Sequence, residues 1–205
     1  MHPVLFDLGG FTVSTFGVMM VAGFLVGWVL FTRELARKGL PLDAAQPVIL
    51  LAAAGGVAGS RLYYLLDHHQ ELLRDFGGMI TSRGGLTWYG GFVLATLLLA
   101  WYVRRRGIPL LRALDCMAPA LALGYAIGRV GCYLVGDDYG APAALPWAVA
   151  FPEGAPPTER EVHPTQVYET VTTCAIFAYL WVRRLRPAPD GAIVLQWFAL
   201  AGLER

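Results

Sequence analysis

Charged residues are scarce in this sequence. They make up 15% of its 205 residues, whereas soluble domains carry about a quarter. So few charges cannot form the outer shell of a soluble domain, which excludes a disordered chain, a nucleic-acid binder and an ordinary cytosolic enzyme. Apolar residues reach 56% and the mean hydropathy is +0.52. We therefore expect the excess apolar surface to face lipid.

Two further scarcities narrow the class. The three cysteines (Cys116, Cys132 and Cys174) are an odd number without metal-ligand spacing, so we expect neither a disulfide framework nor a metal site. The first ten residues contain no lysine or arginine, although a cleaved signal peptide carries positive charge before its apolar run. We therefore interpret the first apolar run as a retained helix.

Six apolar runs are candidates for membrane spans, each of which needs about 20 mostly apolar residues. The predicted spans are Phe11–Phe31, Gln46–Leu66, Gly85–Val103, Leu114–Leu134, Thr165–Val182 and a sixth that begins near Gly191. The sequence thus predicts an all-α membrane protein, a polytopic bundle of six transmembrane helices. We expect a single domain over residues 1–205.

Basic residues concentrate in alternate loops. Ten of them follow the first, third and fifth spans, and three follow the second and fourth. Because cytoplasmic loops carry the excess of lysine and arginine, this pattern places the N-terminus on the outer side of the membrane.

Three arginines lie in or beside apolar spans: Arg61, Arg129 and Arg205. An arginine at mid-membrane costs at least about 2.5 kcal/mol, so it usually faces a protein interior or a polar cavity. For Arg61, extension of the side chain to the lipid headgroups is an equal alternative.

The segment Gly128–Gly140 places Arg129 among four glycines in thirteen residues. Glycines allow a ligand or another backbone to approach closely. A guanidinium is shaped for bidentate contact with phosphate, and lipids supply phosphates at the membrane interface. The alternative is that Arg129 pairs with Asp137 or Asp138 only to fasten a loop.

A second segment, Gly84–Gly91, has two glycine pairs around a polar and aromatic centre. Trp88 and Tyr89 would suit an interfacial anchor, but an anchor does not require paired glycines. We therefore expect this part of the chain to pass close to another group.

The third segment, His163–Glu169, opens the fifth span. Thr165 is a candidate N-cap, and an acidic residue near the helix start meets a favourable dipole. Capping leaves His163, Gln166 and Tyr168 unexplained. By the predicted topology all three segments lie at the outer leaflet, which predicts a site there.

Together these segments resemble the prolipoprotein diacylglyceryl transferase family. Its motifs are Gly-Gly-hydrophobic-x-aromatic-His-Gly-Gly, Gly-Arg-x-Gly-Asn-x-hydrophobic-Asn-Gly-Glu-x-x-Gly and His-Pro-Ser-Gln-x-Tyr-Glu. They correspond in order to Gly84–Gly91, Gly128–Gly140 and His163–Glu169, and residues 3–24 are similar to the family's first span. The resemblance therefore covers nearly the whole chain.

The resemblance implies transfer of the diacylglyceryl group of phosphatidylglycerol to the thiol of a lipobox cysteine. It implies phosphatidylglycerol, lipobox-containing prolipoprotein signal peptides and membrane lipids as partners, no nucleic acid, and no cofactor or metal. The expected location is the bacterial inner membrane, multi-pass, with the active site toward the periplasmic leaflet. The family continues into a seventh helix past Arg205, so the sequence is expected to be either a fragment or a form shortened at its C-terminus.

The resemblance also implies a set of site residues. The catalytic candidates are Arg129, Arg205, Tyr89 and Glu169. The substrate-binding candidates are Arg129, Gly128, Gly131, Asp137, His163, Gln166, Tyr168, Gly90 and Gly91.

Several residues depart from the family pattern. Tyr89 stands where many members have histidine, and a phenol with a pKa of about 10 is a poor base. Cys132 and Val135 replace two asparagines, and Asp137 replaces a glutamate. We expect a structural role for Cys132, because the acceptor thiol comes from the peptide.

A catalytically impaired lipid-binding paralogue is the alternative function. A small transporter fits less well, because the polar residues gather at one leaflet.

Overall fold

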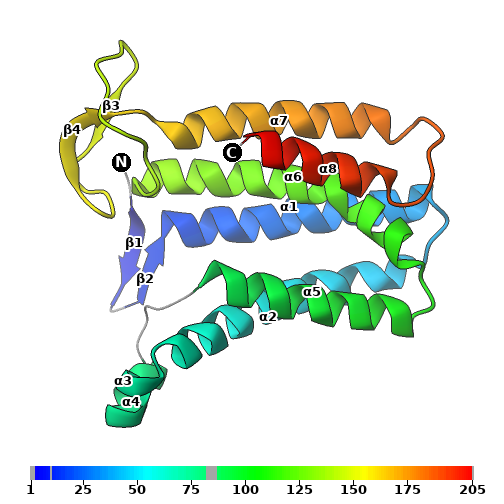
Figure 1. Ribbon diagram of the computed structural model, residues 1–205, viewed down its shortest axis with the longest axis horizontal. Coiled ribbons are helices and arrows are strands. Elements are labelled where there is room, and N and C mark those ends of the chain that lie inside the picture. Colours follow the sequence, from blue (N-terminus) through cyan, green and yellow to red (C-terminus); the bar gives the residue numbers. More distant parts are fainter. Residues whose placement is uncertain (1–2, 10, 82–86, 205) are drawn as a thin grey trace. The chain divides into compact units, whose positions relative to one another are not determined.

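The computed structural model describes residues 3–9, 11–81 and 87–204, and it is mainly helical (Figure 1). The chain divides into two compact units. The terminal unit comprises Met1–Glu34 and Leu114–Arg205, and the central unit comprises Leu35–Ala113. The assignment of a single domain over residues 1–205 stays a prediction.

Six longer helices occupy the six predicted apolar runs. They are α1 (Thr15–Arg37), α2 (Ala45–Asp67), α5 (Trp88–Arg105), α6 (Leu110–Val135), α7 (Thr165–Arg183) and α8 (Ala192–Glu204). Among the described residues, three helical segments are long and apolar enough to cross a membrane: α1, Leu42–Asp67 and α6. The class of all-α membrane protein is confirmed, whereas six spans and an outer N-terminus remain predictions.

Short elements complete the fold. A 3-10 helix, η1 (Leu42–Ala44), precedes α2, and α3 (His69–Arg74) and α4 (Phe76–Thr81) follow it. The strands are β1 (Val4–Leu8) and β2 (Phe11–Ser14), which form one antiparallel pair, and β3 (Val149–Phe151) and β4 (Thr158–Val162), which form another.

The first hairpin corrects the predicted start of the first span. The helix begins at Thr15 rather than at Phe11, because residues 11–14 pair with β1. Thr12 and Val13 are β-branched and suit a strand. Gly9 has φ 62°, a left-handed conformation that suits the tight connection between the two strands.

The core of the terminal unit lies among α6, α7 and α8. Ala118 and Ala122 of α6 are fully buried. The small alanines allow larger side chains to pack closely, and these are Ile176, Leu180, Ile193, Val194 and Trp197. Helix α1 packs on α6 through glycine as well, since a Cβ added to Gly23 would lie 3.5 Å from the carbonyl oxygen of Gly124.

Two buried carboxylates hold helix ends in the terminal unit. Asp115 of α6 is 3% exposed and accepts hydrogen bonds from the backbone N–H groups of Gly191, Ile193 and Val194 at 2.9–3.0 Å. It therefore caps α8 from another helix, satisfying donors that a helix start leaves unpaired. Glu34 of α1 forms an ion pair with Arg184, which follows α7. The ends of α1 and α7 thus lie together, as expected for two helices running in the same direction.

The central unit is built on a close contact between α2 and α5. A Cβ added to Gly59 would lie 2.3 Å from the Gly90 oxygen, and one added to Gly91 would lie 2.4 Å from the Ser60 Oγ. The predicted close approach of the second glycine pair is confirmed, and its neighbour is α2. Arg61 donates to the backbone carbonyl of Met79 in α4, and its guanidinium lies 5.6 Å from the Tyr64 ring centre.

Candidate active site

Arg129 and Glu169 form the centre of the candidate site. Arg129 lies in the last two turns of α6 and is 8% exposed, and Glu169 lies one turn into α7. The Arg129 Nε lies 2.5 Å from Glu169 Oε2, and Nη2 donates to Oε1 at 3.0 Å. This two-point contact is the strong, directional form of an ion pair. It offsets the cost of burying a guanidinium.

Tyr125 of the same helix as Arg129 also holds the Glu169 carboxylate. Its hydroxyl donates to Glu169 Oε2 at 2.6 Å. Tyr125 and Arg129 are four residues apart on α6, so they share one face of the helix. This spacing could have identified Tyr125 from the sequence, and our sequence analysis missed it.

The other edge of the guanidinium faces the loop after α6. Arg129 Nη1 donates to Asp138 Oδ2 at 3.0 Å and lies 3.7 Å from the Cys132 Sγ. The Asp138 side chain is 70% exposed, whereas that of Arg129 is 9% exposed. From the sequence, Asp137 and Asp138 were the alternative partners of Arg129; in the structure the partners are Asp138 and Glu169.

The first turn of α7 holds this loop in place. Gln166 Nε2 donates to the Asp137 carbonyl at 2.5 Å, and Thr165 Oγ1 donates to the Asp138 carbonyl at 2.8 Å. The prediction that Thr165 caps α7 is wrong: the N-cap is Pro164, which makes no capping side-chain hydrogen bond. The Thr165 hydroxyl is used instead to fasten the loop. Gly136, with φ 77°, reverses the chain at the end of α6.

Two buried acceptors at this loop have no hydrogen-bond partner among the described residues. They are the Gln166 Oε1 and the Asp137 Oδ1, and Gln166 is fully buried. Buried polar atoms normally have partners. These two oxygens are therefore suited to accept hydrogen bonds from a bound molecule that carries hydroxyl groups.

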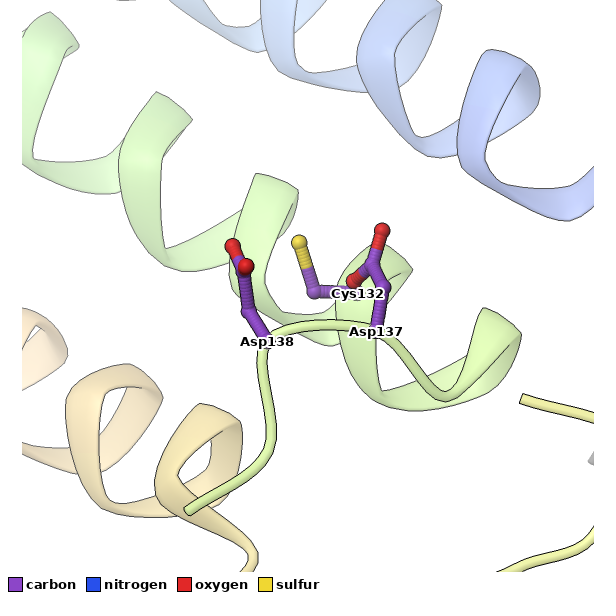
Figure 2. A group of neighbouring side chains, drawn as sticks. All are labelled: Cys132, Asp137 and Asp138. Carbon is purple, nitrogen blue, oxygen red and sulfur yellow. The ribbon is translucent and has the colours of Figure 1, made fainter. Parts of the chain in front are cut away.

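Cys132, Asp137 and Asp138 place their side chains on the same side of the chain (Figure 2). One potential ligand atom from each lies within 4.8 Å of the others, a spacing that could hold a metal ion. The Arg129 guanidinium contacts both Cys132 and Asp138. A cation there would meet that positive charge, so Asp138 fits better as a counter-ion of the arginine.

His163 and Tyr168 belong to a neighbouring aromatic cluster. The Tyr168 hydroxyl accepts a hydrogen bond from Trp147 Nε1 at 2.7 Å and lies 3.3 Å from His163 Nδ1. A Cβ added to Gly140 would lie 3.0 Å from the His163 Cβ. This cluster positions the chain between α6 and α7, and Trp147 was not identified from the sequence.

A cavity of about 390 Å³ lies between the end of α6 and β3. Its lining residues are Tyr133, Leu134, Val149, Ala150, Phe151, Pro152 and Glu153. Phe151 is 1% exposed and stacks on Tyr139 with ring centres 5.4 Å apart. The cavity therefore has a rigid aromatic wall.

Comparison with known proteins decides the family. The model of the prolipoprotein diacylglyceryl transferase family matches residues 3–205. The chain belongs to this family. Two relatives are the phosphatidylglycerol–prolipoprotein diacylglyceryl transferases of Finegoldia magna and Clostridium tetani. Each is 29% identical to this chain over its whole length, and the matched region spans 81% of the first relative and 83% of the second. That of Nitratidesulfovibrio vulgaris is 34% identical over 93% of this chain and 73% of its own.

Two of the three family motifs lie in the terminal unit: Gly128–Gly140 and His163–Glu169. They come together around Arg129. Gly131 allows α6 to pack on α1, because an added Cβ would lie 3.1 Å from the Met19 Cβ. An added Cβ at Gly128 would meet nothing within 4 Å.

The remaining candidate residues lie in the central unit or outside the described residues. Tyr89, Gly90 and Gly91 lie in the central unit, where Tyr89 is 68% exposed beside Trp88. Their membership of the site remains a prediction, and contact with α2 accounts for the two glycines. Arg205 lies outside the described residues, as do Gly84 and Gly85 of the first motif.

Proposed function

We propose that this chain transfers the diacylglyceryl group of phosphatidylglycerol to the lipobox cysteine of a prolipoprotein signal peptide. The observation that carries the proposal is the buried Arg129, held in a fixed orientation by Glu169 at the ends of α6 and α7. The names of the relatives support the choice of donor and acceptor.

The reaction requires stabilisation of a departing phosphate. The acceptor thiolate forms a bond to the glycerol carbon, the carbon–oxygen bond to phosphate breaks, and its electron pair stays on the phosphate oxygen. Negative charge therefore grows on the phosphate during the reaction. A preorganised guanidinium in a low-dielectric site is suited to stabilise it. Arg129 takes this role, and Arg205 is proposed as a second cation.

The other residues bind and orient the donor lipid. The unpartnered oxygens of Gln166 and Asp137 can accept hydrogen bonds from the hydroxyl groups of the glycerol head. Glu169 holds Arg129 in place and is proposed as the acceptor of the thiol proton. Gly128 leaves space beside the arginine, and the aromatic cluster of His163 and Tyr168 shapes the approach.

The proposal includes a setting in the bacterial inner membrane, with the site toward the periplasmic leaflet and a single transferase domain over residues 1–205. The alternation of basic loops supports this orientation. The pairing of Glu34 with Arg184 supports it as well, because it places the basic ends of α1 and α7 side by side.

A reconstituted lipidation assay tests the proposal. The full chain in vesicles that contain phosphatidylglycerol should add a diacylglyceryl mass to a synthetic lipobox peptide, and Arg129→Ala should reduce the rate at least about a hundredfold. Arg129→Lys keeps the charge but loses the two-point geometry, so it should recover only part of the rate. Full activity of Arg129→Ala in a correctly inserted protein would reject the role of this arginine.

One observation favours a second candidate, a lipid-binding paralogue without catalysis. Tyr89 replaces a family histidine and therefore lacks the imidazole nitrogen that could accept a proton. Binding of phosphatidylglycerol without modification of any lipobox peptide would support this alternative.

A further inference from the structure

Two carboxylates of its own chain contact the guanidinium of Arg129. Glu169 contacts Nε and Nη2, and Asp138 contacts Nη1. An arginine has five N–H donors in a fixed plane, and Nη1 also lies 3.7 Å from the Cys132 Sγ. A phosphate that binds to the Nη1 edge of Arg129 must therefore displace the Asp138 carboxylate.

Asp138 is the weaker of the two partners. Glu169 makes two contacts with the arginine, and its side chain is 23% exposed. Its carboxylate also accepts a hydrogen bond from the Tyr125 hydroxyl. Asp138 makes one ion pair with Arg129, and its side chain is 70% exposed. Exposed ion pairs contribute little to stability, so the contact with Asp138 is the one that a ligand can break.

The loop is built so that the Asp138 side chain can leave without moving the backbone. The Asp138 carbonyl accepts the Thr165 hydroxyl, and the preceding Asp137 carbonyl accepts the Gln166 amide. Asp138 itself has φ 53°, a left-handed conformation that these bonds help to maintain. Rotation about its side-chain bonds would carry the carboxylate into solvent and expose Nη1.

We propose that Asp138 is a displaceable counter-ion that sets the affinity of the site for phosphate. It occupies Nη1 when the site is empty, gives way to the phosphate of the donor lipid, and returns to Nη1 as the product leaves. This inference rests on the proposed function and names a residue that neither the sequence motifs nor the relatives assign.

The greater negative charge of the product phosphate explains why a returning Asp138 carboxylate would help the reaction. The donor lipid contains a phosphodiester with one negative charge. Cleavage of its carbon–oxygen bond leaves a phosphate monoester, which carries a charge of about −1.5 to −2 at neutral pH. Arg129 therefore binds the product more tightly than the substrate, and a competing carboxylate accelerates product release.

Asp138→Asn tests the inference, because asparagine keeps the shape and tolerates the left-handed conformation. The probe is glycerol phosphate, titrated calorimetrically into the full-length chain in detergent micelles. The dissociation constant should fall about twofold to fivefold in Asp138→Asn, in the range expected for loss of one exposed ion pair. Product inhibition of lipidation by glycerol phosphate should become correspondingly stronger, and the KM for phosphatidylglycerol should fall.

Glu159→Gln is the matched control, because it removes one exposed carboxylate from β4 of the same unit. Its dissociation constant should equal that of the wild type, which separates a local effect from a change in overall charge. Asp138→Gly is a second variant that permits the same backbone conformation.

Equal or weaker binding of glycerol phosphate in both Asp138 variants would overturn the inference. A hundredfold loss of kcat with unchanged binding would also overturn it, since Asp138 would then act as a base. Binding and turnover separate the two proposals. Asp138-dependent binding without lipidation contradicts the proposed function alone, and lipidation with Asp138-independent binding contradicts this inference alone.

Discussion

Arg129 and Glu169 meet edge to edge, with Nε 2.5 Å from Oε2 and Nη2 3.0 Å from Oε1. The two residues are 40 positions apart in the sequence and come from different helices. Their contact therefore joins the end of α6 to the start of α7 and also orients the guanidinium. Binding geometry and helix packing depend on the same pair.

Glu169→Gln should lower the kcat for peptide lipidation at least about tenfold, equivalent to about 1.4 kcal/mol in the barrier. The amide keeps the size of the side chain but loses the charge that aligns Arg129. Tyr125→Phe removes only the hydroxyl bond to Glu169, so a loss of about threefold is expected. Steady-state kinetics in phosphatidylglycerol vesicles measures both. An unchanged kcat in Glu169→Gln would show that Asp138 alone can align the arginine.

Asp115→Ala should lower the free energy of unfolding by about 2–3 kcal/mol, since a buried carboxylate that caps α8 through three hydrogen bonds is lost. Asp115→Asn keeps one acceptor oxygen and should lose less. Reversible unfolding of the detergent-solubilised chain provides the measurement. Glu161→Gln, an exposed carboxylate on β4, is the control and should change stability little. Equal stability of Asp115→Ala and the wild type would contradict the capping role.

Gly59→Ala should destabilise the central unit by about 1–3 kcal/mol, because the new methyl group would lie 2.3 Å from the Gly90 oxygen and force α2 and α5 apart. Gly56→Ala on the same helix is a closely matched control. Its added Cβ meets nothing within 4 Å, so it should be neutral or stabilising by up to about 1 kcal/mol through helix propensity. Resistance to proteolysis in micelles compares the two variants. Equal resistance would mean that the helices are not in close contact.

Much of the fold was predictable from local pattern. The apolar runs identified six helices, because burial of apolar side chains needs no knowledge of which helix packs on which. The glycine pair before α5 correctly indicated a close approach, although only the structure identified α2 as the neighbour. The residues Phe11–Ser14 were assigned to a helix, because their pairing with β1 carries no signal in hydropathy.

The sequence predicted which residues form the candidate site better than it predicted the contacts between them. Arg129, Asp137, Gln166 and Glu169 were named from the sequence, and the structure brings all four to one place. Thr165 was misassigned as a cap, because a hydroxyl at a helix start can either accept a bond from its own helix or donate to another segment. The choice depends on the distant Asp138 carbonyl.

Composition and periodicity by themselves established a helical membrane protein with an arginine among glycines at a helix end. They could do so because hydropathy and backbone freedom are properties of consecutive residues. Only the tertiary structure decided that Glu169 contacts one edge of the Arg129 guanidinium and Asp138 the other. It also decided that Asp115 caps a helix 76 residues further along the chain. Such pairings depend on distance and direction between side chains on separate elements, and these are set when the helices pack.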